Sequence, residues 1–443
     1  MSHKPNIVFI TTHDTGRHFG CYGRDTVQSP AIDHLAEEGV RFTNCYCVAS
    51  KCSPSRAAMM TGRWPQANGV YGLTHAPHWW EYNDGEKHLA AVLREVGYST
   101  HLFHFQHETE EPKSLGFDRL HGVHTWPEDE MPDPYMFTPA PEVARDFAEF
   151  CDDATSGHRP FYAQIGFFET HRPFDFGGNE GDEELGVELP SNYQENAGHR
   201  RFFRMLQGAI RQVDEAVDVI IQALRDSGLH EDTLVIFTTD HGVSYKRAKG
   251  TLYDPGLEVA LIMFWPGGGV RGGRTCGGLM SNIDVFPTVL ELVGVEVPDN
   301  VQGVSFAPVV RGGSERERQY VFGELQEQMF SRCVRDDRYK LIRNFRGSLV
   351  TPAPVNGGGP PYPARPVIEM YDLRADPIES ENVAEHPTYA EERDRLDAVL
   401  LRHLREVNDH ILDQPPATPY NDRARAHCRR AMTRLGLQQR EGR

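Results

Sequence analysis

Apolar and polar residues alternate in blocks along the chain, and the blocks predict alternating strands and helices. Apolar runs rich in β-branched and aromatic residues predict buried strands. Apolar residues at helical spacing, between a Pro or polar start and a Gly stop, predict helices. The predicted strands are 6–12, 99–105, 160–169, 233–240 and 258–265, and the predicted helices are 29–39, 87–98, 201–229 and 284–294. We therefore expect an α/β fold with a large mixed, mostly parallel sheet sandwiched by helices.

The pattern changes after about Gly313, where the predicted strands become short. These strands are 319–325, 331–337, 339–344 and 367–373. A Pro/Gly-rich loop at 350–366 interrupts them, and a helix is predicted around 389–407. We expect a larger domain over 1–312, a smaller α+β subdomain with a small antiparallel sheet over 313–410, and a tail over 411–443. The tail is rich in arginine and is expected to be solvated or to brace an oligomer.

Charge and cysteine content narrow the classes of partner. The formal net charge is −18, which disfavours nucleic acid and anionic membranes. An anionic small substrate is still compatible with this net charge, because a local site can be positively charged in a protein whose net charge is negative. No apolar run approaches the ~20 residues of a membrane helix, and the apolar run 7–10 is too short for a signal sequence. We therefore expect a cytoplasmic protein, and since the eight cysteines lack regular spacing, we expect them to be free thiols.

Polar pairs follow two of the predicted strands. His13 and Asp14 follow strand 6–12, and Asp240 and His241 close strand 233–240. Carboxyl ends of parallel strands form one edge, where such sheets bind ligands. Two carboxylates and two imidazoles there predict a divalent cation site, although each pair alone is also typical of surface or cap residues. Oxygen ligands suit Ca²⁺ or Mg²⁺, and imidazole shifts the preference toward Mn²⁺, Fe²⁺ or Zn²⁺.

Four further polar residues could serve an anionic substrate. Arg56 and Lys249 offer fixed positive charge to a tetrahedral oxyanion. His107 and His171 follow predicted strands and could protonate a leaving group. Taken singly, either histidine is also compatible with a structural, hydrogen-bonded role.

Cys52 opens a predicted helix in the stretch KCSPSRAAMMTGRWP. Pro54 presets the first helical turn, so Cys52 lies at a helix N-terminus, which suits an anion or a thiolate. The cysteine could therefore be a thiolate nucleophile, a buried filler or the precursor of another group.

The motif Cys52-x-Pro54-Ser55-Arg56, with a downstream T-G-R at 61–63, resembles the signature of the formylglycine-dependent sulfatases, which belong to the alkaline phosphatase superfamily. Other segments resemble the same family in the same order. They are 5–23, 97–107, 233–242, 249–254 and 370–387. The segment 61–79 is most similar to the branch that contains N-sulfoglucosamine sulfohydrolase.

The resemblance implies hydrolysis of a sulfate ester or sulfamate on a sugar or other small organic molecule. A formylglycine-generating enzyme would convert Cys52 to an aldehyde, whose hydrate has two hydroxyls. One attacks sulfur and displaces the alcohol or amine, and the other re-forms the carbonyl and expels sulfate. A thiolate has no second hydroxyl with which to release the sulfate. The implied catalytic residues are Cys52, Arg56, His107, His171 and Lys249. The implied ligands of one Ca²⁺ or Mn²⁺ ion are His13, Asp14, Asp240, His241 and Cys52.

Two positions depart from the family pattern. His13 stands where the family usually has an aspartate, and Phe105 stands where it has a lysine that holds a sulfate oxygen.

Two other functions are alternatives to a sulfatase. They are a phosphodiester or phosphonate monoester hydrolase of the same superfamily, and a non-catalytic anion-binding protein with unconverted Cys52. His75, His78 and Trp79, with the neighbouring Trp80, could line a sugar pocket, or could pack inside the protein. A homo-oligomer is compatible with the sequence.

Overall fold

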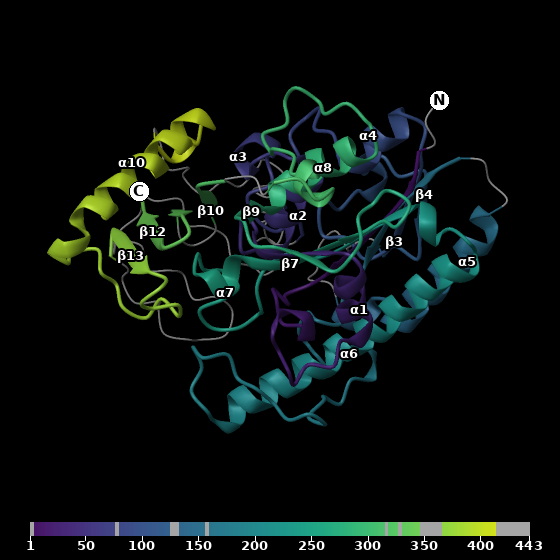
Figure 1. Ribbon diagram of the computed structural model, residues 1–443, viewed down its shortest axis with the longest axis horizontal. Coiled ribbons are helices and arrows are strands. Elements are labelled where there is room, and N and C mark those ends of the chain that lie inside the picture. Colours follow the sequence, from purple (N-terminus) through teal and green to yellow (C-terminus); the bar gives the residue numbers. More distant parts are fainter. Residues whose placement is uncertain are drawn as a thin grey trace, which may run out of the picture.

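The computed structural model describes residues 4–75, 79–124, 133–155, 159–314, 318–326, 330–345 and 366–412, and its elements follow the predicted alternation (Figure 1). Within these residues the main sheet has nine strands in the order β4-β3-β5-β1-β6-β7-β2-β8, with β9 paired to β2. Its strands are β1 (Asn6–Thr12), β2 (Val40–Tyr46), β3 (Ser99–His104), β4 (Arg119–His121), β5 (Phe161–Gly166), β6 (Thr233–Thr239), β7 (Glu258–Phe264), β8 (Arg274–Cys276) and β9 (Met280–Ser281).

Helices cover both faces of this sheet, so the predicted α/β fold is confirmed (Figure 1). The helices are α1 (Pro30–Glu38), α2 (Cys52–Thr61), α3 (Pro65–Asn68), α4 (Leu89–Glu95), α5 (Ala140–Ala154), α6 (Ala197–Asp226), α7 (Asp254–Leu257), α8 (Val285–Leu292), α9 (Ala307–Val310) and α10 (Ala390–Glu406).

Strand β1 shows how the two cores form. Its residues alternate between the faces of the sheet. Ile7 and Phe9 pack in the core shared with α2, α4 and α8, and Val8 and Ile10 pack in the core shared with α1, α5 and α6. Because both faces are covered, the strand reads as a continuous apolar run.

The carboxyl ends of four parallel strands meet at one edge. In register, Thr12 of β1 lies beside Thr239 of β6, and Gly166 of β5 lies beside Thr11 of β1 and His104 of β3. The residues that follow these strands therefore emerge side by side.

A second, antiparallel sheet lies in the C-terminal part and contains β10 (Val321–Leu325), β11 (Ser331–Arg335), β12 (Tyr339–Asn344) and β13 (Ile368–Asp372) in that order. Helix α10 packs on it through Leu396, Leu400 and Leu404. This is the smaller α+β subdomain that the sequence predicts. The domain boundaries at residues 312 and 410 stay predictions, and the predicted loop 350–366 and tail 411–443 lie almost wholly outside the described residues.

Several boundaries differ from the prediction for local reasons. Helix α6 starts at Ala197 because Asn196 caps it by accepting from the His199 amide. Helix α4 is shorter than 87–98, with the His88 side chain capping its start. Strand β2 and helix α5 are not among the predicted elements.

In the part of the chain that the structure describes, none of the helices combines the length and apolarity of a membrane span.

Candidate active site

Helix α2 carries the Cys52 motif into the interior. All ten of its residues are buried, and it begins at Cys52 after Lys51, whose backbone is extended. Pro54 sits in the first turn, where its missing N–H costs no helical hydrogen bond. The motif therefore forms the start of a buried helix beneath the carboxyl edge of the sheet.

Arg56 is fully buried and organises this edge rather than facing open space. Its Nε donates to Asp240 Oδ2 at 3.1 Å, its Nη1 to Thr11 Oγ1 at 3.1 Å and its Nη2 to the Thr12 carbonyl at 3.2 Å. One guanidinium thus joins the ends of β1 and β6 and fixes one carboxylate. A buried charge of this kind is stable only because its donors are satisfied.

Lys249 and Asp14 form a close pair above Cys52. Lys249 Nζ lies 2.8 Å from each Asp14 carboxylate oxygen and 3.2 Å from Cys52 Sγ. Burial by itself raises the pKa of Asp14, but the charges of Lys249 and of the nearby histidines outweigh it and hold that pKa well below its ordinary value. Asp14 is therefore ionised at neutral pH.

Cys52 sits at the centre of the cluster. Its Sγ lies 3.2 Å from His241 Nε2 and 3.8 Å from Asp14 Oδ1. Burial, together with the charges of Asp14 and Asp240, raises the pKa of the Cys52 thiol to about 12, although the charge of Lys249 lowers it. This environment opposes a thiolate nucleophile, one of the three roles open to Cys52 from the sequence.

The buried histidines fit a cation site. His241 Nδ1 lies 2.8 Å from the Gly242 carbonyl, so this nitrogen carries the proton and donates it. The His241 Nε2 lone pair then faces Asp14 Oδ1 at 3.1 Å, an arrangement of two acceptors that a cation stabilises. His13 Nδ1 lies 2.9 Å from Asp240 Oδ2, and among the described residues His13 Nε2 has no hydrogen-bond partner.

The donor atoms of His13, Asp14, Cys52 and Asp240 all lie within 4.8 Å of one another. Burial and the charge of Arg56 lower the pKa of His13 to about 3, so its imidazole is neutral at pH 7. A neutral imidazole beside ionised carboxylates is the chemical form that binds a metal. The residues present therefore fit one divalent cation.

Phe105 forms an apolar wall of the site. Its ring lies 4.5 Å from the His13 ring, and the Arg56 guanidinium carbon lies 5.7 Å from its centroid. It also packs on Phe168, which places an aromatic surface where the family pattern has a lysine. Lys249 is therefore the sequence-predicted cation that reaches Cys52 directly.

His107, His75 and His171 lie around the same centre. The rings of His75 and His107 stack at 5.0 Å, and that of His107 lies 5.8 Å from His13. His171 is partly exposed, and its Nδ1 lies 2.7 Å from the Arg172 carbonyl and donates to it. Its Nε2, 3.9 Å from Asp14 Oδ2, is thus the nitrogen left to exchange a proton with a substrate.

The structure brings together the predicted catalytic and cation-binding residues, which come from segments more than 200 positions apart. Trp79 is only 2% exposed, so its indole is packed inside the protein here, and His78 lies outside the described residues. Sequence reasoning missed Thr11, which accepts from Arg56, and Asn282, whose Nδ2 donates to Ser55 Oγ at 2.9 Å. Thr11 lies in the family-like segment 5–23 but is not distinguished there from its neighbours, and Asn282 lies in no motif, so only their contacts reveal them.

Comparison with known proteins agrees with this geometry. The family model described as Sulfatase matches residues 5–295. The chain belongs to the sulfatase family. The resemblance carried by the Cys52–Arg56 motif is thereby confirmed.

This sulfatase is 28% identical to an ulvan-active sulfatase of Formosa agariphila, over 96% of its own chain and 85% of the relative. It is 25% identical to human N-sulphoglucosamine sulphohydrolase, over 91% of its own chain and 90% of the relative. The protein is accordingly a hydrolase of sulfuric esters.

Solved structures share its fold. A protein in complex with its substrate D-glucosamine-2-N,6-O-disulfate matches with a TM-score of 0.72 and 19% identity, covering 94% of this chain and 100% of that chain. A phosphonate monoester hydrolase from Silicibacter pomeroyi matches with a TM-score of 0.71 and 20% identity, covering 93% and 97%. At these identities the likeness shows the fold alone.

Proposed function

We propose that this sulfatase removes sulfate from a sugar or other small organic molecule, as a sulfate ester or a sulfamate, by means of formylglycine at position 52 and one divalent cation. The observation that carries the proposal is the position of Cys52. It opens a buried helix and contacts Asp14, His241 and Lys249 at the carboxyl edge of the sheet.

Formylglycine at position 52 would supply a geminal diol, one hydroxyl of which attacks sulfur while the other later releases the sulfate by re-forming the carbonyl. A formylglycine-generating enzyme is the partner that this requires. The cation would be held by His13, Asp14, Asp240 and His241, and it would polarise a sulfate oxygen.

The chain's own residues have separable tasks. Lys249 places an ammonium group against the reacting side chain, which stabilises charge on the transferred group. Arg56 keeps Asp240 in place. Because Nδ1 donates to the Arg172 carbonyl, Nε2 of the partly exposed His171 carries the lone pair, so it can first take up the proton of the attacking hydroxyl and then pass that proton to the departing alcohol or amine.

The sugar character of the substrate is supported by the relatives. The names of two aligned relatives specify ulvan and N-sulphoglucosamine. His75 is buried and stacks on His107, and we propose that it borders the organic part of a bound substrate.

The proposal is tested at position 52 first. The enzyme is produced in cells that contain the formylglycine-generating enzyme, and the peptide that spans residue 52 is analysed by mass spectrometry. Aldehyde at residue 52 in the active enzyme is the expected result, and unmodified cysteine in fully active enzyme would contradict the mechanism.

A phosphonate monoester hydrolase is the second candidate, favoured by His13 in the cation cluster and by Phe105 in place of the family lysine. Rates on an aryl sulfate and on a matched aryl phosphonate monoester separate the two. We expect the higher kcat/KM on the sulfate, and the reverse order would favour the second candidate.

We also propose a cytoplasmic location. It is supported by five free thiols in the described part of the chain, which are Cys21, Cys45, Cys47, Cys151 and Cys333.

A further inference from the structure

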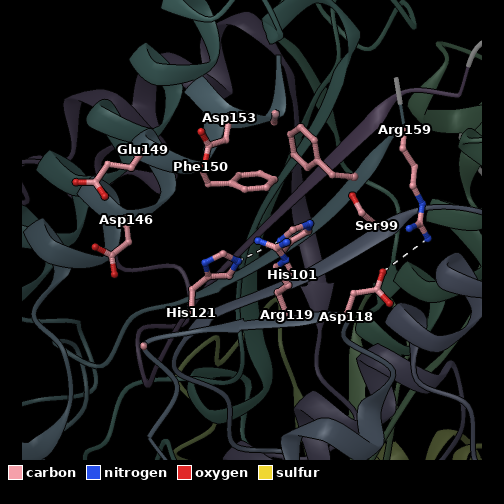
Figure 2. A pocket seen from close by; sticks show the side chains of 13 residues that line it. Ser99, His101, Asp118, Arg119, His121, Asp146, Glu149, Phe150, Asp153 and Arg159 are labelled. Carbon is pink, nitrogen blue, oxygen red and sulfur yellow. Dashed lines mark hydrogen bonds and ion pairs between the residues drawn. The ribbon is translucent and has the colours of Figure 1, made fainter. Parts of the chain in front are cut away.

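A second histidine cluster lies at the edge of the main sheet, outside the candidate active site (Figure 2). It lines a cavity of about 810 Å³ between strands β3 and β4 and helix α5. None of the residues that line this cavity belongs to the Cys52 cluster. Any ligand here would therefore be independent of the proposed reaction.

His101 and His121 form the centre of this cavity. Strand register pairs His101 with Arg119 and Phe103 with His121, so the two histidines are diagonal neighbours on one face of the sheet. His101 Nδ1 lies 3.1 Å from His121 Nε2. The centroids of the two rings lie 5.3 Å apart with an interplanar angle of 29°, and Figure 2 shows the side chains of Glu149, Phe150 and Asp153 above them.

Aromatic packing holds both rings in this orientation. The His121 ring stacks on buried Phe103 at 4.1 Å with an interplanar angle of 6°. The His101 ring packs against Phe150 of α5 at 4.5 Å. The two nitrogen atoms are therefore oriented before any ligand arrives, which is what a tight site requires.

The surrounding charges favour a cation. Carboxylates at Asp146, Glu149 and Asp153 follow helical spacing and line the cavity from α5 (Figure 2). Across the whole cavity four carboxylates face two guanidinium groups. An anion would meet net negative charge, whereas a divalent cation would be attracted.

We propose that His101 Nδ1 and His121 Nε2 together bind one divalent transition-metal ion of the Zn²⁺ class. Two nitrogen ligands of a tetrahedral zinc stand about 3.3 Å apart, given bonds of about 2.0–2.1 Å. The observed pair at 3.1 Å needs to open only slightly. One of the two nitrogens holds the proton of their shared hydrogen bond, and when the ion binds, that ring shifts its proton to its other nitrogen, so that both lone pairs face the ion. Water completes the coordination.

The ion would tie edge strand β4 to its neighbour β3. Imidazole nitrogen selects Zn²⁺, Ni²⁺ or Co²⁺ over Mg²⁺ and Ca²⁺. Neither substrate nor formylglycine is needed for this binding, so it stands or fails separately from the proposed function.

The test measures bound zinc in the full-length enzyme. Chelator-treated protein at pH 8 is titrated with Zn²⁺, desalted and analysed for metal by mass spectrometry. The variants are His121→Gln and His101→Gln. The matched control is His34→Gln, because His34 is an exposed histidine beside two carboxylates on α1. Asp240→Ala serves as the variant that removes the other candidate ion.

We expect His121→Gln and His101→Gln to hold one zinc ion fewer per chain than wild type, or to bind it at least about 10-fold more weakly, since one of two nitrogen ligands is lost. Aryl sulfate hydrolysis should be unchanged in both, and His34→Gln should match wild type. Asp240→Ala should keep this ion. An unchanged zinc content in both cavity variants, or an equal loss in His34→Gln, would overturn the proposal. If the more deeply buried His101 variant does not fold, His121→Gln decides alone, because His121 is only half-buried.

Discussion

Replacing Lys249 with alanine removes the ammonium group that lies between Asp14 and Cys52. The group makes three contacts, at 2.8 Å to each Asp14 oxygen and at 3.2 Å to Cys52 Sγ. The contact with the reacting side chain is the one that can strengthen as charge develops on the transferred sulfate. With Phe105 occupying the place of the family lysine, no other predicted lysine shares this task.

The expected loss of kcat can be estimated from the effect of removing one hydrogen-bond donor of similar position in other enzymes. Removal of one preorganised oxyanion donor costs on the order of 10²–10³ in kcat, or about 2.7–4 kcal/mol. The same substitution leaves Asp14 without its ammonium partner, and breaking a buried pair costs about 3–5 kcal/mol of stability at most. His241 Nε2, 3.1 Å from Asp14, remains, so we expect the loss of stability to fall below that range.

The assay must separate these two effects. We would measure kcat and KM for an aryl sulfate, together with thermal unfolding, for wild type, Lys249→Ala and Lys246→Ala. Lys246 is the matched control because it lies in the same loop but is exposed. We expect the alanine variant at position 249 to lose mainly kcat while it stays folded at assay temperature, and the control to behave as wild type.

One result would refute the reasoning. If folded Lys249→Ala kept kcat within a few-fold of wild type, another group would have to stabilise the transferred anion. Loss of activity that exactly tracked the unfolded fraction would instead assign Lys249 a structural role.

Four shorter predictions follow from the same contacts. Cys52→Ser should be almost inactive or trapped as a sulfated adduct, because serine has no second hydroxyl; intact-protein mass after incubation with substrate checks this, and normal turnover would contradict it. Asp240→Ala should lose both bound cation and rate, and metal analysis that finds the ion retained at full activity would place the cation site elsewhere. His13→Asp should shift cation preference toward Ca²⁺, because oxygen replaces nitrogen; calorimetric titrations with Ca²⁺ and Mn²⁺ measure the shift, and identical preferences would show that position 13 is not a ligand. Burial raises the pKa of Glu324 to about 8, although the charge of Arg332 lowers it. The contribution of Glu324 to stability is therefore full below about pH 4.5 and is lost as the pH rises through 8. Glu324→Gln should flatten the pH dependence of the free energy of unfolding, measured in urea at pH 6 and pH 9, and the same pH dependence in variant and wild type would contradict this.

Local patterns in the sequence were sufficient for the elements and for the principal motif. The apolar run of β1 is long enough and sufficiently β-branched to predict its bounds, Asn6–Thr12, correctly. Pro54 and Gly62 bracket α2, and the spacing from Cys52 to Arg56 identifies the family. These signals are carried by neighbouring residues, so no knowledge of distant contacts is needed.

The roles of individual side chains depended on contacts across the chain. The sequence predicts an anion-binding role for Arg56, and only the structure shows that each of its three guanidinium nitrogens donates to Asp240, Thr11 or Thr12. Residue 105 was recognised as a missing lysine, but only packing shows that its ring forms a wall against His13.

The sequence by itself thus determined the fold class, the family and the cluster of polar residues at the strand ends. Only the tertiary structure decided which of these side chains face the reacting centre, which brace it, and that His101 meets His121 at the β4 edge of the main sheet. The physical reason is that element formation follows local periodicity, whereas a side chain's role follows from burial and from partners that may lie more than 180 residues away, as Asp240 does from Arg56.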